Sequence, residues 1–277
     1  MVKLVTDSAS DVPADVAKEL GITVVPLHVQ FANQTYKDRV DLTAEEFYNR
    51  LVHSTTLPKT SAPSPGTFAE IFDTLSAKCS GILCVFVSRK LSATYDAALQ
   101  GIKLMKRKCS VEVVDSMLGI MGEGFLAMEA AAKAKAGASL DELVNFISVT
   151  IPRVHVRVTL DTLEYLARGG RIGKVQALLG SMLKMNPILG LKDGVAFPAG
   201  RVRSRAKATE WLFQFASSFN KIKALAVEYG TNVAEAKAFA ARLASVFPKS
   251  AIYMSNVSPV IGTHTGPNLL GLTVLEE

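Results

Sequence analysis

Small hydroxyl and carboxyl side chains follow three predicted strands in the first half of the chain. They lie at residues 6–8, 88–92 and 115–116, and the loop 53–66 is rich in the same residue types. Ligands bind outside the carboxyl ends of parallel strands, which share one edge of a sheet. These side chains therefore predict a polar site that donates hydrogen bonds. A second interpretation stays open, since Ser, Thr and Asp in such places also cap the helices that follow.

Motifs that would carry catalysis are missing from the sequence. It has no GxSxG nucleophile elbow, no HExxH zinc motif and no GxGxxG loop after a predicted strand. The three cysteines, Cys79, Cys84 and Cys109, form no CxxC pair, which argues against a disulfide scaffold and a zinc site. We therefore expect a binding protein rather than an enzyme, with no metal and no cofactor.

Two other segments are candidates for contact with an anionic group. Residues 169–174 come near a Walker A loop but are one residue short, and no Ser or Thr follows Lys174. We reject a nucleotide site there and expect a flexible basic turn whose backbone amides can face an anion. His264 lies between Gly262 and Gly266, which predicts a bent backbone able to approach a ligand closely, with an ordinary surface turn as the alternative.

Short apolar runs alternate with amphipathic segments through the first 150 residues. Strands are expected at 2–5, 22–29, 82–87 and 111–114, and helices at 13–20, 43–51, 68–77, 92–105 and 119–136. This alternation is typical of a parallel sheet with helices on both faces. We expect an α/β fold with a three-layer parallel-sheet domain at residues 1–150.

The second half of the chain shows a different pattern. Strands are expected at 153–160, 188–191, 195–197, 224–227, 251–254 and 272–275, and helices at 206–219 and 233–246. Lys192, Asp193 and Gly194 between two of these runs indicate a hairpin. We expect an α+β domain with a mixed sheet at residues 151–277, packed directly on the first domain.

The composition limits the classes of protein to which this chain can belong. The 277 residues are 49% hydrophobic and 20% charged, as in an ordinary globular protein. The net charge of +6 is dispersed, so no nucleic-acid partner is expected. There is no signal-peptide pattern at Met1 and no apolar run of the ~18 residues that a membrane span requires. We expect a cytoplasmic protein without stable membrane insertion.

The order of several short motifs resembles the DegV family of bacterial fatty-acid-binding proteins. The matching stretches span nearly the whole chain: Thr6-Asp7-Ser8, Thr60 to Ser64, Ser88, Leu91 to Tyr95, Asp115-Ser116, Asp161 to Gly173, Asn186 to Leu189, Arg201 to Arg203 and His264 to Pro267. Ala62, Ala93 and Asn268 depart from residues common in the family. Each stretch is weak by itself, but their joint order is highly specific.

This resemblance implies a two-domain DegV-like fold with a long-chain fatty acid in a cleft between the domains. It places the carboxylate of the ligand at Thr60, Ser61, Ser92, Thr94 and His264. It also implies a carrier that presents the bound acid to a separate fatty-acid kinase, related to dihydroxyacetone kinases, for phosphorylation. Arginine suits contact with such a partner because its planar fork pairs with carboxylate or phosphate. The residues expected to dock the kinase are Arg168, Arg171, Arg201, Arg203 and Arg205.

Apolar residues of the second half are candidates for lining the acyl chain, with plain core packing as the alternative. They are Leu163, Leu166, Leu178, Met182, Met185 and Ile188. A different function also stays open, namely a phosphotransferase-type enzyme subunit that acts on a small carbonyl compound through His264. The missing nucleotide loop and metal ligands count against it.

Overall fold

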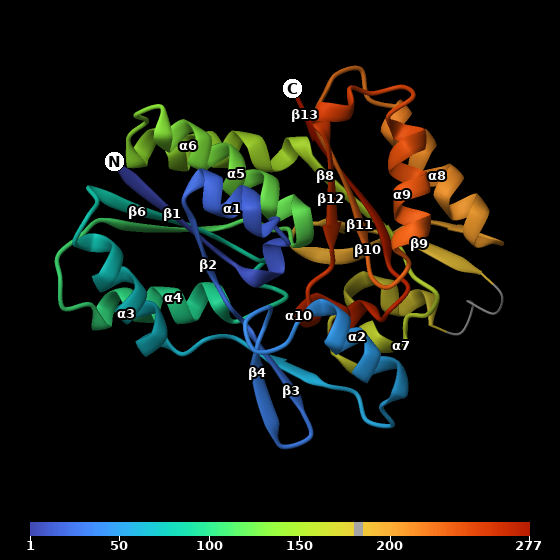
Figure 1. Ribbon diagram of the computed structural model, residues 1–277, viewed down its shortest axis with the longest axis horizontal. Coiled ribbons are helices and arrows are strands. Elements are labelled where there is room, and N and C mark those ends of the chain that lie inside the picture. Colours follow the sequence, from blue (N-terminus) through green and yellow to red (C-terminus); the bar gives the residue numbers. More distant parts are fainter. Residues whose placement is uncertain (180–184) are drawn as a thin grey trace.

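The computed structural model describes residues 1–179 and 185–277. A four-stranded parallel sheet occupies the N-terminal part and a six-stranded mixed sheet the C-terminal part (Figure 1). The expected α/β fold class is therefore confirmed. None of the described helices is long and apolar enough to cross a membrane.

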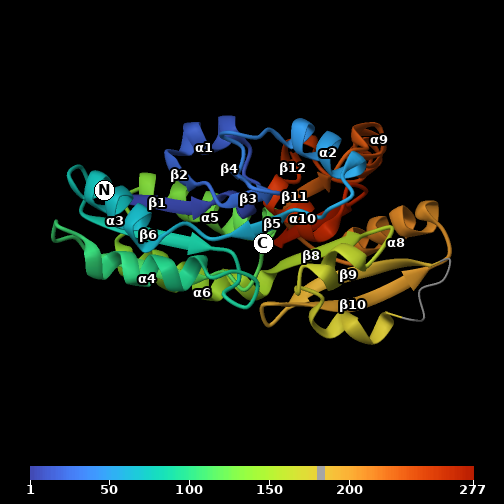
Figure 2. The ribbon, with the colours of Figure 1, turned by 90° about the horizontal axis from the view of Figure 1, so that it is seen from below.

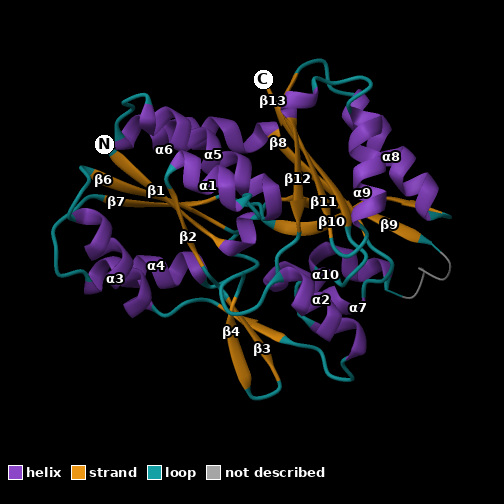
Figure 3. Ribbon diagram, viewed as in Figure 1, coloured by secondary structure: helices purple, strands orange, loops and turns teal. Residues whose placement is uncertain are grey.

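The parallel sheet is a layer between two sets of helices. Its strand order is β2 (Ile22–Val25), β1 (Val2–Asp7), β6 (Gly81–Phe86), β7 (Val111–Asp115). One face carries α1 (Ala14–Leu20), α5 (Ile120–Lys135) and α6 (Leu140–Thr150), and the other carries α3 (Pro65–Ser76) and α4 (Thr94–Leu104) (Figure 3). Every residue of β6 is buried, as expected for a central strand covered on both faces.

The mixed sheet is mostly antiparallel. Its order is β10 (Val195–Val202), β9 (Asn186–Lys192), β8 (Val154–Thr159), β13 (Leu270–Glu276), β11 (Ile222–Tyr229), β12 (Ile252–Asn256), and only the β11–β12 pair is parallel among the strand pairs of this described sheet. Leu225 and Val227 pack in the cluster that contains residues of α8 (Arg205–Ser217) and α9 (Val233–Leu243), whereas Ala224 and Ala226 pack in the cluster of α5. This alternation gives both faces of the sheet an apolar partner.

Helix α5 joins the two sheets. Phe125 and Leu126 pack in one cluster with Val85 of the parallel sheet and with Val156 and Ala226 of the mixed sheet. Figure 2 shows the sheets following one another along the molecule. A helix whose apolar surface is shared in this way fixes the position of one sheet relative to the other.

The region from 26 to 61 differs from expectation. The single strand predicted at 22–29 is wrong, because Pro26 lacks the N–H that would continue the ladder. The chain instead leaves the parallel sheet and forms an antiparallel three-stranded sheet of β4 (Gln34–Lys37), β3 (His28–Phe31) and β5 (Lys59–Ser61), beside α2 (Ala44–His53). Residues of this region pack against Val260, so contacts cross the domain boundary predicted near residue 150.

Short helices complete the description. The structure has α7 (Glu164–Arg168), α10 (Pro259–Thr265) and the 3-10 helices Ser8–Ser10, Ile151–Arg153, Gly173–Leu178 and Lys249–Ala251. The bent turn expected around His264 is wrong, since His264 lies in the last turn of α10. Pro259 occupies the first turn of that helix, where its fixed φ favours helix initiation.

Candidate functional site

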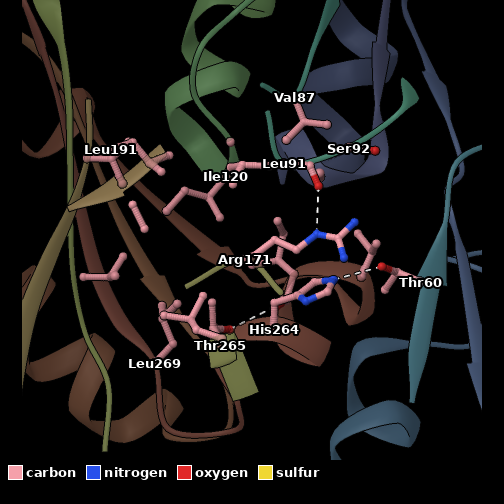
Figure 4. A pocket seen from close by; sticks show the side chains of 18 of the residues that line it. Thr60, Val87, Leu91, Ser92, Ile120, Arg171, Leu191, His264, Thr265 and Leu269 are labelled. Atoms are coloured by element: carbon pink, nitrogen blue, oxygen red, sulfur yellow. Dashed lines mark hydrogen bonds between the residues drawn. The ribbon is translucent and has the colours of Figure 1, made fainter. Parts of the chain in front are cut away.

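A cavity of about 330 Å³ lies between the two parts of the molecule (Figure 4). Its walls are mostly aliphatic and come from both sheets. The apolar side chains that line it are Ala9, Leu27, Val87, Leu91, Ile120, Val156, Val158, Leu160, Leu166, Leu189, Leu191, Val260, Ile261 and Leu269. An aliphatic cavity of this size suits an apolar ligand.

Polar groups gather at one end of the cavity. Thr60 and Ser61 come from β5, Ser92 from the loop before α4, and His264 from α10. The Oγ1 of Thr60 and the Nε2 of His264 are 2.8 Å apart and share a hydrogen bond (Figure 4). Ser61 is exposed, so this end of the cavity reaches the solvent.

Arg171 also lines the polar end. Its Nε donates to the carbonyl of Leu91 at 3.0 Å, and its Nη1 donates to the carbonyl of Gly169 at 2.7 Å. The guanidinium therefore ties the loop that carries Ser92 to the end of α7. Burial and the nearby charge of Arg171 lower the pKa of His264 to about 4, so the imidazole is neutral at neutral pH.

The sequence analysis named five residues for the ligand carboxylate, and the structure brings four of them, Thr60, Ser61, Ser92 and His264, to the cavity. Thr94 is fully buried behind Ser92, and the two hydroxyl oxygens are 2.8 Å apart. It therefore supports Ser92 rather than lining the cavity. Their role in ligand binding stays a prediction.

The five arginines do not form one group. Arg171 lines the cavity, whereas Arg168 is exposed and pairs with Glu164. Arg205 is half-buried and donates to Glu235 at 2.8 and 2.9 Å. Arg201 and Arg203 are exposed at and just beyond the end of β10, outside the cavity wall.

Of the residues proposed for the acyl chain, Leu166 lines the cavity. Leu163 and Ile188 are buried in hydrophobic clusters, as the core-packing interpretation expects. Leu178 and Met185 do not line the cavity, and Met182 lies outside the described residues. The sequence analysis did not name the lining residues of the N-terminal part. It also did not name Val156 and Val158 of β8, although the alternation at 153–160 places these two side chains on the same face.

The polar turns after the parallel strands converge as expected, but their groups are already paired. Thr6 donates to Glu123 at 2.8 Å, and Ser8 donates to Asp38 at 2.7 Å. Asp7 accepts from the amides of Ala9 and Val87. None of these groups lines the cavity, so they stabilise the fold and do not face a ligand.

In the glycine-rich turn 169–174, the first three amides are already bonded within the chain, and an anion site at the others stays a prediction. The amides of Gly169, Gly170 and Arg171 donate to carbonyls at the end of α7. Gly169 has a packing role instead, because a Cβ built on it would lie 2.2 Å from the Nδ1 of His264. Glycine at this position lets α7 press against the imidazole.

Comparison with known proteins places this geometry in a family. The model of a family described as "Uncharacterised protein, DegV family" matches residues 1–277. The chain belongs to the DegV family. A DegV domain-containing protein of Caldanaerobacter subterraneus is 34% identical over 100% of this chain and 99% of its own length. One from Streptomyces coelicolor is 35% identical over 99% and 98%.

Solved DegV structures share the fold. A DegV family protein of Thermus thermophilus, described by its fatty acid binding, has a TM-score of 0.91 at 33% identity, covering 100% of this chain and 99% of that one. A stearic acid-binding protein of Eubacterium ventriosum has a TM-score of 0.91 at 26% identity, covering 100% and 98%. These DegV relatives are therefore fatty-acid-binding proteins with the architecture described above.

Proposed function

We propose that this DegV chain binds one long-chain fatty acid, with its tail in the aliphatic cavity and its carboxylate at Thr60, Ser61 and Ser92. The observation that carries the proposal is the cavity itself, which is aliphatic along its walls and polar at the end that reaches solvent. The bound fatty acids of its structural relatives support the same ligand class.

The tail supplies most of the binding free energy. Each buried methylene contributes about 0.8 kcal/mol, so a tail of ~14 methylenes gains on the order of 11 kcal/mol before the costs of ordering and association. Hydrogen bonds to the ionised carboxylate add about 1.5–3 kcal/mol each and fix its orientation. A carboxylate without such partners would be too costly to bury.

The state of His264 decides what Thr60 offers to the ligand. The Nδ1 of His264 is buried without a partner, and an unpaired buried acceptor is tolerated better than an unpaired N–H. We therefore assign the hydrogen to Nε2, which donates to the Oγ1 of Thr60. The hydroxyl hydrogen of Thr60 is then available to the carboxylate. In this arrangement His264 acts through Thr60 as a positioning residue.

The same arrangement disfavours the phosphotransferase alternative. A nucleophilic imidazole needs one nitrogen open to the substrate, but Nε2 is engaged by Thr60 and Nδ1 lies against Gly169. We propose that the chain performs no chemistry of its own and acts as a carrier. A cytoplasmic kinase would then phosphorylate the carboxylate at the solvent-exposed polar end, and this step of the proposal rests on the family resemblance.

Native mass spectrometry of the purified protein tests the ligand. We expect a bound species with the mass of a fatty acid, which organic extraction removes and added fatty acid restores. A protein that is isolated without lipid and fails to take up fatty acid would contradict the proposal. Phosphorylation or hydrolysis by the isolated chain, lost in His264→Ala, would support the enzyme alternative instead.

A further inference from the structure

The turn between β9 and β10 lies against the loop between β6 and α4. The Oγ of Ser88 donates to the carbonyl of Gly194 at 2.8 Å, in a buried contact. The Nζ of Lys90 donates to the carbonyl of Asp193 at 2.9 Å, in an exposed one. Together with the bond from Arg171 to Leu91, these contacts connect the two parts of the molecule beside the polar end.

Ser88 links this contact to the site. Its carbonyl accepts from the amides of Leu91 and Ser92, and its hydroxyl oxygen accepts from the amide of Lys90. The loop that carries Ser92 is therefore folded around Ser88. Leu91 on one side of the contact, and Leu191 on the other, both line the cavity. The contact is thus part of the wall that encloses the ligand.

A second set of contacts between the two parts of the molecule, near α5, uses different hydrogen bonds. There the Oε1 of Glu228 accepts from the amide of Met121 at 3.0 Å, and the Oδ1 of Asp11 accepts from the amide of Ser258 at 2.9 Å. The Oγ of Ser255 donates to the carbonyl of Asp11 at 2.6 Å. All three bonds are buried, and α5 packs on both sheets beside them. These buried contacts suit a hinge, whereas the exposed bond of Lys90 suits a contact that opens.

The turn between β9 and β10 is a tight one. Asp193 and Gly194 both have positive φ values, 53° and 78°, as in a two-residue hairpin of type I′.

We propose that the β9–β10 turn closes the cavity and that the hydrogen bond from Ser88 to Gly194, here called the catch, holds the turn in place. Ligand exchange then proceeds through breakage of this bond. The proposal rests on the proposed function, because it assumes that the cavity takes up a fatty acid. The acyl chain lies between walls from both parts, so parting these walls would free the tail along its length, in addition to the exit at the solvent-exposed polar end.

Stopped-flow transfer of a fluorescent fatty acid to excess phosphatidylcholine vesicles tests the catch. In Ser88→Ala we expect release and uptake rates to rise at least about fivefold, because the variant loses the bond to Gly194 and also the acceptor of the Lys90 amide. We expect Kd to change less than about twofold, because in this proposal the bond closes the turn equally in the free and the bound protein, so its loss speeds uptake and release alike. Gly194→Ala should act similarly, since its Cβ would lie 2.5 Å from the Oγ of Ser88. Ser148→Ala is the matched control, as its exposed hydroxyl donates to the carbonyl of Val144 on α6.

Hydrogen exchange of the ligand-free protein separates the catch from the ligand. Amides of residues 191–195 should exchange faster in Ser88→Ala than in the wild type and in Ser148→Ala. Unchanged exchange and unchanged transfer rates in both folded catch variants would overturn the proposal. A weaker Kd with an unchanged uptake rate would also overturn it, by making Ser88 a ligand contact. If the wild type binds no probe, the proposed function fails, while hydrogen exchange still decides whether Ser88 holds the turn.

Discussion

At the scale of single residues, the hydroxyls of Thr60 and Ser92 both lie at the polar end of the cavity. We expect Thr60→Ala with Ser92→Ala to weaken fatty-acid binding at least tenfold per hydroxyl, since a hydrogen bond to a charged group contributes about 1.5–3 kcal/mol. The melting temperature of the ligand-free protein should change little. Calorimetric titration measures the affinity, with Thr74→Ala as the control because its exposed hydroxyl caps only its own helix. An unchanged affinity would remove both hydroxyls from the site.

The sequence identified these hydroxyls for reasons that could not extend to their neighbours. Thr60 and Ser92 are polar residues in family motifs, Thr60 in a predicted loop and Ser92 after a predicted strand end, where ligands bind in parallel sheets. Leu27 and Ile120 are apolar in apolar surroundings, and only the packing of distant segments decides which of them faces a cavity. The contact of Arg171 with the carbonyl of Leu91 is equally hidden, because a backbone acceptor has no sequence signature.

At the scale of elements, the end of α7 sets the position of the imidazole on α10. Gly169→Ala places a Cβ within 2.2 Å of the Nδ1 of His264, so the ring must move and its bond to Thr60 is lost. We expect fatty-acid affinity to fall about tenfold, the effect of one hydrogen bond to a charged group. Gly66→Ala is a control, since its Cβ would meet only the Oγ of Ser64 at 3.7 Å. Equal affinities of the two variants would contradict this coupling.

The end of β10 carries Arg201 and Arg203, which are exposed and outside the cavity. Reversing both charges should leave lipid binding unchanged but slow kinase-dependent phosphorylation of the bound acid. The loss should appear mainly in the association rate and fade with added salt, as steering by exposed charges does. A reconstituted assay with a cognate kinase measures it, beside a lipid titration of the same variant. If both activities fall together, these arginines serve the fold or the ligand.

The types of the helices and strands were easier to predict from the sequence than the places where the chain departs from regular alternation. Alternating apolar runs identified the strands and helices of both sheets, because periodicity reports burial. The break at Pro26 has a local cause that the prediction overlooked, since proline lacks the N–H of a strand ladder, whereas the helix around His264 depends on contacts with other segments. Glycines beside His264 favour a turn locally, whereas packing of α10 against the region 27–51 stabilises the helix.

At the scale of the whole molecule, buried carboxyls make stability depend on pH. Burial raises the pKa of Asp7 and Asp38 to about 7 and that of Glu228 to about 8. The folded chain holds these protons where the unfolded chain, with values near 4, has released them. Their stabilising effect is present in full below about pH 4 and is lost as pH rises through 7 to 8. His264 acts oppositely, because its lowered pKa costs stability as pH falls from about 6.5 to 4.

Burial also raises the pKa of Asp11 to about 6 and that of Glu123 well above its usual range. Five such carboxyls outweigh one imidazole, so the free energy of unfolding of the ligand-free protein should fall between about pH 5.5 and 8. Urea unfolding at constant ionic strength measures it. Glu228→Gln, which stays neutral and can still accept from the amide of Met121, should flatten the upper part of this profile. Glu112→Gln, at an exposed position of β7, should not. A midpoint that rises with pH would show that these carboxyls are ionised in the folded chain.

The aliphatic cavity also sets how the protein competes with lipid bilayers. A methylene gains about 0.8 kcal/mol on leaving water, whether it enters a protein cavity or a bilayer. The tail term therefore nearly cancels when a fatty acid passes from membrane to protein. What remains is the difference in free energy between a carboxylate at the polar end of the cavity and a carboxylate in the headgroup layer. On the proposed function, the chain would behave as a second, dispersed phase in partition equilibrium with the membrane, and its degree of loading would follow the free fatty acid content of that membrane.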